Sequence, residues 1–310
     1  MKKRTLMRGL CTALVLCMLL ACLGGCAMPT RYRLSYIFAD RYLVGAGDYY
    51  AEDIERIEIN WGAGDITLIR GEQERLDFFE SASSLSEAQQ LHSLVLDNVL
   101  YVQYCESDYY GSIPAEQKSL TLYIPDGVDL VLNCVSGTVS MDGVDFDSAR
   151  IDTTSAQLCL GTVTFDSLLI YNGSGDLTAQ LLQGKQLYCS ATSGAVSVKE
   201  MKVEHPWIEL LSGSVKIDAL TASDYEFYTT SGSMDVTLTE DATGAMNTNS
   251  GSIVLALPEL SNVSVRFEGA SELFYTERAC TMTQIGRYSY GNGAFGLIAV
   301  STTSGTLTVK

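Results

Sequence analysis

The chain has 310 residues, and its 37 acidic residues outnumber its 20 Lys and Arg residues, for a formal net charge of −17. This acidity excludes nucleic acid as a partner, because that class of protein needs a basic surface to neutralise phosphates. It equally excludes electrostatic attraction to anionic lipid. Because 46% of the residues are hydrophobic and only 18% are charged, the chain is too apolar to be an acidic disordered protein, and we expect a large buried core.

Residues 1–25 predict a bacterial export signal. An apolar stretch covers residues 10–23, which is shorter than the ~20 residues that a membrane-spanning helix needs. Without this segment, 16 basic residues face 37 acidic ones and the net charge becomes −21. The charged residues of the segment are all basic: Lys2, Lys3, Arg4 and Arg8.

The end of this signal, Leu23-Gly24-Gly25-Cys26, resembles the bacterial lipobox, in which signal peptidase II cuts before the cysteine. The resemblance implies that Cys26 carries a thioether-linked diacylglycerol, usually joined by an N-acyl chain, and two or more acyl chains give stable anchoring. The alternative is an ordinary secretory signal with a chance cysteine. No second apolar span follows, so we expect residues 26–50 to form a tether and the remaining chain to lie outside the cytoplasm, lipid-anchored at the cell surface.

Five of the nine cysteines remain once the signal and Cys26 are set aside. An odd number with irregular spacing does not predict a disulfide framework, and the absence of a CxxC pair leaves a zinc site without support. The five are Cys105, Cys134, Cys159, Cys189 and Cys280.

A Ser-Gly pair, or a close variant, recurs every 19 residues across six intervals. Apolar residues stand four before, three after and five after each serine, with mainly polar residues between the last two. This period of two predicts strands with one buried face, and not helices. The pairs are Ser136-Gly137, Ser155-Ala156, Ser174-Gly175, Ser193-Gly194, Ser212-Gly213, Ser231-Gly232 and Ser250-Gly251. We interpret them as structural corners, since glycine permits φ > 0 and serine can bond nearby backbone.

One repeat cannot bury its own apolar face, but stacked repeats bury each other's. The sequence therefore predicts an all-β fold: a single parallel β-solenoid (β-helix) of about 19 residues per coil, forming one domain over residues 51–310. The same register fits outlying corners at Ala63-Gly64 and Ser304-Gly305. Interruptions are expected near 71–118, with a short helix at 85–91 and a strand within 95–104, and near 261–292.

The run Ile57–Leu68, the segment Lys118–Pro125 and the Ser-Gly coils together resemble the bacterial putative-adhesin family of β-strand-repeat proteins, a domain of unknown function. The resemblance implies a β-solenoid exposed on the bacterial surface. Because some members accompany envelope-stress regulators, it also implies a sensing role as an alternative. The family has no established catalytic residues to transfer. Ser155-Ala156 departs from the pattern, and we expect it to change one turn.

The sequence gives little support for an enzyme. His92 and His205 fall in different regions, and the GxSxG motif of triad hydrolases is absent. Asp147 and Asp166 share a repeat position with Asp145 nearby, which is either a weak Ca²⁺ site or, as we favour, a solvated acidic edge. We predict no catalytic residue, cofactor or metal.

Two groups of side chains could contribute a binding surface. Threonines cluster before the corners, where β-propensity and corner hydrogen bonding explain them better than a ligand does. Four aromatic residues of 261–292 either bind a glycan or protein or, as we favour, cap the open end of the solenoid: Phe274, Tyr275, Tyr288 and Tyr290. The sequence thus predicts a non-catalytic, adhesin-like surface module whose partner is a glycan, a wall polymer or a surface protein. The alternative is a component of envelope-stress sensing that contacts a membrane partner.

Overall fold

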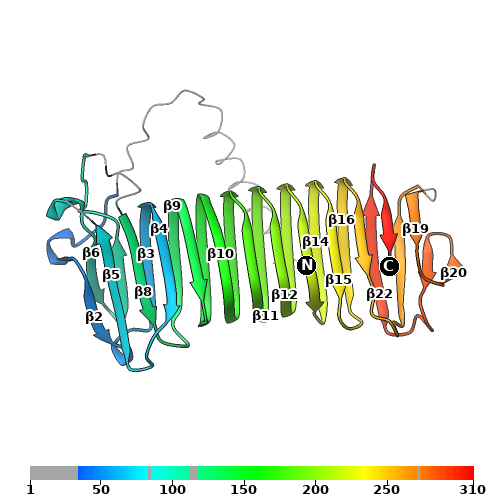
Figure 1. The fold of residues 1–310 in the computed structure, drawn as a ribbon, viewed down its shortest axis with the longest axis horizontal. Coiled ribbons are helices and arrows are strands. Elements are labelled where there is room, and N and C mark those ends of the chain that lie inside the picture. The colour runs from blue at the N-terminus through cyan, green and yellow to red at the C-terminus, as the bar shows by residue number, and fades with distance from the viewer. Residues whose placement is uncertain (1–33, 83–84, 112, 114–117, 271–272) are drawn as a thin grey trace, which may run out of the picture.

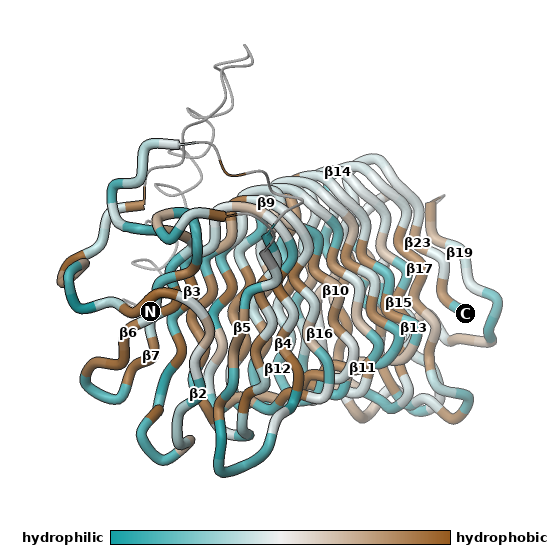
Figure 2. Tube along the Cα trace, turned by 60° about the vertical axis from the view of Figure 1, so that its left-hand side comes forward, coloured by the Kyte–Doolittle hydropathy of each residue, from teal (hydrophilic) through white to brown (hydrophobic). Residues whose placement is uncertain are grey.

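The computed structural model describes residues 34–310, apart from 83–84, 112, 114–117 and 271–272. They form an elongated stack of strands, all in one hydrogen-bonded sheet that winds about the long axis (Figures 1 and 2). The predicted all-β parallel solenoid is therefore confirmed. No helix within the described ranges is both long and apolar enough to cross a membrane. The expected signal peptide and Cys26 lie outside the described residues.

The central coils stack in a constant register. Leu158 pairs with Leu177, Leu177 with Val196 and Val196 with Val215, so each residue lies beside the one 19 positions along the chain. The same register keeps like residues together in columns. The strands, all paired in parallel, are β9 (Asp129–Asp142), β10 (Val144–Ser174), β11 (Leu177–Ser193), β12 (Val196–Ser212), β13 (Val215–Thr221), β14 (Asp224–Ser231), β15 (Met234–Leu238), β16 (Thr243–Ser250) and β17 (Ile253–Ala256).

Inward-facing columns fill the interior. Ile151, Ile170, Ile208 and Phe227, each four residues before a corner serine, are fully shielded from solvent. Burying one such side chain contributes about 1.5–3 kcal/mol relative to leaving it exposed. Because every coil adds such residues to the same columns, the core continues along the whole stack.

The corner glycines occupy backbone conformations that other residues rarely adopt. From Gly137 to Gly251 their φ angles run from 116° to 151°, and a Cβ on any of them would overlap the carbonyl oxygen of the corner one coil earlier. The exception is Ala156, whose φ is not positive: β10 runs through this corner in extended conformation. In Figure 2 the corners form part of the pale ridge along the stack, from β9 to β14.

At the N-terminal end, antiparallel strands close the parallel stack. The first coil, β3 and β4, pairs with β9 on one side and with β7 and β8 on the other. Beyond β7 and β8 every pairing is antiparallel. The elements are η1 (Ala39–Arg41), β1 (Leu43–Val44), β2 (Gly47–Tyr50), η2 (Ala51–Asp53), β3 (Arg56–Ala63), β4 (Asp65–Arg70), β5 (Arg75–Ala82), η3 (Glu87–Gln89), β6 (His92–Leu96), β7 (Val99–Gln103) and β8 (Lys118–Ile124).

Two local expectations in this region were incomplete. The single strand expected within 95–104 is a hairpin of β6 and β7, because Asp97 and Asn98 both adopt positive φ (53° and 60°) in a two-residue turn. The helix expected at 85–91 is only the 3-10 turn η3, which Ser86 and Gln89 cap reciprocally.

At the C-terminal end, the chain leaves a gap in the stack and later fills it. Strands β22 and β23 lie between the β16–β17 coil and the strands β18 and β19, which precede them in sequence. Figure 1 shows red β22 between yellow and orange strands. The antiparallel pairs β18–β21 and β20–β21 then close this end. The elements are β18 (Val263–Glu268), β19 (Phe274–Thr276), β20 (Thr281–Gln284), β21 (Arg287–Ser289), β22 (Gly296–Thr302) and β23 (Leu307–Val309).

The aromatic residues of this end act mainly as a cap, as we favoured. Phe274 stacks on Tyr288 with ring centroids 3.8 Å apart. Tyr290 is buried and donates its hydroxyl to Thr276 Oγ1 at 3.1 Å. Tyr275 differs, with 53% of its surface exposed.

The five cysteines of the described chain are free thiols. Cys105, Cys134 and Cys189 are buried, and burial raises their pKa to about 11, about 11 and about 12. Cys159 is exposed; it stands four residues after Ser155, between the two inward-facing columns that follow the corner.

These buried thiols should make the fold sensitive to alkaline pH. A thiol whose pKa is higher in the folded protein than in the unfolded chain keeps its proton up to a higher pH when the protein is folded. The free energy of unfolding therefore falls as pH rises from the unfolded-state pKa toward the folded-state pKa. We expect the urea midpoint to fall between about pH 8.5 and pH 11. Cys189→Ala should make this decline shallower, whatever it does to stability at neutral pH. An unchanged slope would show that Cys189 contributes nothing to the effect.

Candidate functional site

Four partly exposed aromatic residues lie on the outer face of the solenoid in four successive coils. Tyr171 comes from β10, Tyr188 from β11, Trp207 from β12 and Tyr228 from β14. Successive ring centroids are 5.5, 6.3 and 5.4 Å apart. We call this row the aromatic strip. It runs across the strands, along the axis of the stack.

Sequence reasoning missed the aromatic strip because its members are divided between two repeat positions. Tyr171 and Tyr228 stand three residues before their corner serines, whereas Tyr188 and Trp207 stand five before theirs. Side chains two residues apart on a strand point to the same face, so both positions face outward. Reading the two outward columns together, and not singly, would have shown the row.

Each end of the aromatic strip makes a polar contact. At one end the guanidinium of Arg150 lies 4.8 Å from the centroid of the Tyr171 ring. Its Nε and one terminal nitrogen donate to both carboxylate oxygens of Asp152, at 2.6 and 3.1 Å, and this hydrogen bonding raises the Arg150 pKa. Asp152 therefore neutralises the Arg150 guanidinium. At the other end Tyr228 donates its hydroxyl to Glu226 Oε2 at 2.6 Å.

An open polar groove of about 370 Å³ continues from Tyr228 over the next strands. Its floor includes Thr229 and Thr248, both buried, and Thr229 Oγ1 donates to Thr248 Oγ1 at 2.9 Å. Thr229 and Thr248 also contact the carbonyl oxygen of the Gly232 corner, which supports the interpretation that corner hydrogen bonding explains these threonines. The rim carries carboxylates, amides and hydroxyls: Glu209, Glu268, Asn247, Asn249, Thr230 and Thr303.

The face beneath the strip is unusually neutral for so acidic a chain. The strand segments 167–173 and 186–192, which carry Tyr171 and Tyr188, contain no charged residue. The outward neighbours of the rings there are small or neutral, such as Leu169 and Ser190. Charged residues on this face lie on both sides of these neutral segments: Arg150 and Asp152 at one end, and the outward residues Glu209 and Glu226 at the groove end.

The acidic positions predicted as a solvated edge do not form a continuous ladder. Lys185 of the next coil pairs with Asp166, with Nζ 2.7 Å from Oδ2. Asp145 has a pKa raised first by burial and then by the charges of Asp126 and Asp147. Among the described residues, no cluster of three or more His, Cys, Asp or Glu side chains is arranged to hold a metal ion.

The two histidines occupy separate surroundings. His205 lies exposed on β12, and its Nδ1 pairs with Asp224 of the next coil. His92 is buried at the N-terminal end, with Nδ1 3.0 Å from the carbonyl oxygen of Gln90. Neither joins the aromatic strip or the groove.

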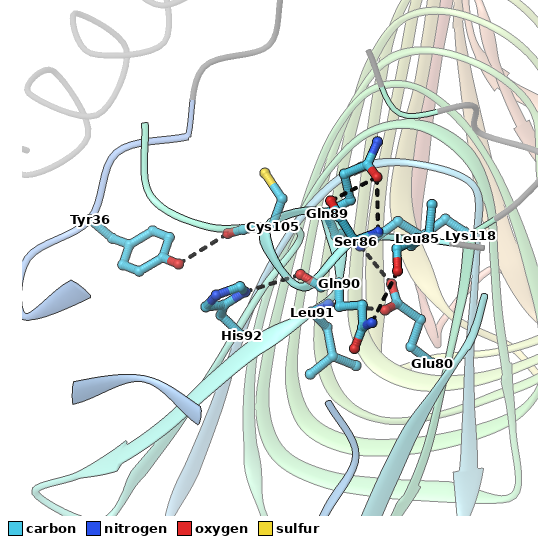
Figure 3. A network of polar contacts seen from close by, with 10 residues as sticks. All are labelled: Tyr36, Glu80, Leu85, Ser86, Gln89, Gln90, Leu91, His92, Cys105 and Lys118. Carbon is cyan, nitrogen blue, oxygen red and sulfur yellow. Dashed lines mark hydrogen bonds and ion pairs between the residues drawn. The ribbon is translucent and has the colours of Figure 1, made fainter. Parts of the chain in front are cut away.

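A second polar cluster lies at the N-terminal end, around the buried pair Lys118 and Glu80 (Figure 3). Lys118 Nζ lies 2.6 Å from Glu80 Oε1 and donates to the carbonyl oxygen of Gln89, while Glu80 Oε2 accepts the backbone N–H of Leu91 at 2.9 Å. The Lys118 side chain is fully buried, and its ammonium lies 4.5 Å from the Tyr104 ring centroid. This cluster ties the loop around η3 to β5 and β8, and we assign it a structural role.

The predicted corner residues line one edge of the solenoid and not a cavity. Gly64, Gly137, Gly175 and Gly194 have φ between 98° and 126°, and the residue before each of them is half-exposed. The later corners continue the row, and their serines are exposed: Ser212, Gly213, Ser231, Gly232, Ser250, Gly251, Ser304 and Gly305. Cys26, the predicted lipidation residue, lies outside the described residues.

Comparison with solved structures shows proteins of similar fold. The solved structures most relevant here include one from Parabacteroides distasonis named a putative lipid binding protein, 17% identical, with a TM-score of 0.52 over 86% of this chain and 96% of that one. A putative adhesin from the same organism, 13% identical, gives 0.48 over 86% and 97%. One from Bacteroides fragilis, 15% identical, gives 0.46 over 86% and 96%. At these identities the likeness concerns the fold alone.

A search of the curated proteins gives no match. The family model described as Toastrack DUF4097 matches residues 54–310, which include strands β3 to β23. The chain therefore belongs to the Toastrack DUF4097 family.

Proposed function

We propose that this protein is a cell-surface lipoprotein whose solenoid acts as an adhesin-like binding module and performs no catalysis. The observation that carries the proposal is the aromatic strip with its adjoining groove. Partly exposed aromatic rings combine apolar area with few rotatable bonds, which is why such side chains dominate binding surfaces. A rigid stack of coils presents them in a fixed row.

The proposal of binding without catalysis is supported by the chemistry of the groove. Its carboxylates, amides and hydroxyls can form hydrogen bonds with a ligand, but none of the described residues that line it is a histidine or cysteine. Acyl transfer by a hydroxyl nucleophile usually uses a histidine base, which these lining residues lack. Glycoside hydrolysis uses two carboxylates instead, and the groove contains Glu209 and Glu268, so the reducing-sugar assay below tests that chemistry directly.

An adhesion assay tests the proposal. Cells that produce the full-length protein should adhere to immobilised cell-wall or host polysaccharide better than deletion cells, and added soluble protein should compete. Equal adhesion by producing and deletion cells on every surface would contradict the adhesin-like role. Release of reducing sugar from the polysaccharide would contradict the absence of catalysis.

The lipid anchor is tested separately. Cys26→Ala should remove the acylation site, so the protein should leave the membrane fraction for the medium or remain as uncleaved precursor. Inhibition of signal peptidase II should likewise leave the wild-type precursor uncleaved. The matched control is Cys22→Ala, which changes a cysteine within the apolar stretch and should be processed and retained as the wild type is. Normal processing and membrane retention of the Cys26→Ala protein would contradict lipidation at Cys26.

A further inference from the structure

We propose that the aromatic strip and the polar groove bind one neutral, linear polysaccharide that runs along the solenoid axis, across the coils. This inference rests on the proposed adhesin-like function and names its ligand class. In this proposal the polymer packs on a platform of aromatic rings and forms hydrogen bonds in the groove beyond Tyr228. The platform consists of Tyr171, Tyr188, Trp207 and Tyr228.

The repeating surface of the strip matches a repeating ligand. The rings recur once per coil at 5.4–6.3 Å, so they form a platform that is long and narrow and not a pocket for one small molecule. Pyranose rings carry apolar C–H faces that pack on aromatic rings, and their rims carry hydroxyls. A polymer of such units can contact several rings at once, and linked contacts strengthen binding without any new type of interaction.

The charge of this face favours a neutral polymer. The strand segments 167–173 and 186–192, which carry Tyr171 and Tyr188, contain no charged residue, while the chain as a whole carries −17. Near the groove the fixed charges are the carboxylates Glu209 and Glu268. A polyanion would meet acidic groups there and gain no cation, whereas a neutral chain meets no repulsion. Arg150 does not alter this balance, because Asp152 neutralises it.

The polar groups of the groove suit the hydroxyls of a sugar. Carboxylates accept hydrogen bonds from hydroxyl groups, and amides both donate and accept them. Glu209, Asn249 and Thr230 present such groups at an exposed rim, and the volume of about 370 Å³ lies within the usual range for ligand sites. Asn247 already accepts a hydrogen bond from Ser301 Oγ at 2.5 Å, which fixes its orientation.

Ring stacking by itself would stabilise the sheet without any ligand, so the test must separate binding from stability. The full-length protein in detergent is titrated with neutral β-1,4-linked hexasaccharides of glucose, xylose and mannose, and with polygalacturonate as the anionic probe. At least one neutral oligosaccharide should bind saturably. Trp207→Leu and Tyr188→Leu should each weaken it by at least about tenfold, whereas Tyr188→Phe, which keeps the ring, should stay within about twofold.

Ser190→Arg provides a second variant that keeps every ring and places bulk and charge on the platform. It should abolish binding while the thermal unfolding midpoint stays near that of the wild type. Lys216→Ala, on the neighbouring face of β13, should change nothing. Failure of all three neutral probes, equal binding of polygalacturonate, or full binding by Trp207→Leu and Ser190→Arg would overturn the inference. If cells still adhere through the protein in that case, for example to a surface protein, the proposed function stands and only the ligand class fails.

Discussion

Replacing Gly213 by alanine should lower the free energy of unfolding by about 2–4 kcal/mol. Gly213 has φ 149°, and an added Cβ would overlap the carbonyl oxygen of Gly194 in the preceding coil. Its own N–H donates to the carbonyl oxygen of Ser231 in the following coil at 3.0 Å, so the corner has no freedom to move away. Urea unfolding followed by far-ultraviolet circular dichroism measures the loss.

Two matched variants control this experiment. Ser212→Ala changes the exposed neighbour and should shift stability by less than about 0.5 kcal/mol. Ala156→Gly restores the common corner residue where the chain is extended, and it should destabilise slightly, by about 0.5–1 kcal/mol, because glycine loses more conformational entropy. A Gly213→Ala protein as stable as Ser212→Ala would show that the corners tolerate side chains and that the stacking geometry described above is wrong.

Glu80→Gln should destabilise the N-terminal end by about 3–5 kcal/mol, because it leaves the buried Lys118 ammonium without its counter-charge. The side chains of the pair, Lys118 and Glu80, are 0% and 5% exposed. Burial lowers the pKa of Lys118, and the hydrogen bond and charge of Glu80 oppose that shift. Removing the carboxylate should therefore lower the Lys118 pKa further.

The effect of Glu80→Gln should depend on pH in a defined direction. The pKa of Lys118 is lower in the folded protein than in the unfolded chain, so keeping this lysine charged in the folded protein costs stability. This cost decreases as pH rises from the folded-state pKa toward the unfolded-state pKa, because the folded protein then releases the proton. The gap in stability between wild type and Glu80→Gln should therefore shrink as pH rises. Adding Lys118→Met to Glu80→Gln should recover part of the loss at neutral pH. A double variant that is less stable than either single variant would contradict a charge-based explanation.

The fold was predictable from the sequence because its cause is periodic. A column such as Ile151, Ile170 and Ile208 repeats at the spacing of the coil, so the apolar pattern defines both the strand faces and the stacking register. The ends of the solenoid were harder to predict from the sequence. The placement of β22 between β16 and β18 depends on which strand edges remain unpaired, and a local pattern does not encode that.

The candidate site was harder to predict for a related reason. Surface residues are free of the packing that keeps core columns regular, so Tyr188 and Tyr228 occupy different repeat positions and still lie in one row. The Lys118–Glu80 pair joins residues 38 positions apart on antiparallel strands outside the repeat, and only the folded chain brings them together. Sequence reasoning therefore predicted the scaffold and missed the surface that we propose to be functional.

The most direct test of ligand binding along the aromatic strip is oxidative footprinting of the wild-type, full-length protein with and without the neutral hexasaccharide that binds best. Hydroxyl radicals oxidise accessible aromatic rings, and mass spectrometry locates each product. We predict protection at Tyr171, Tyr188, Trp207 and Tyr228, with no change at Tyr275, which is exposed on the C-terminal cap. Saturable binding that leaves the oxidation of all four strip residues unchanged would contradict the proposed site.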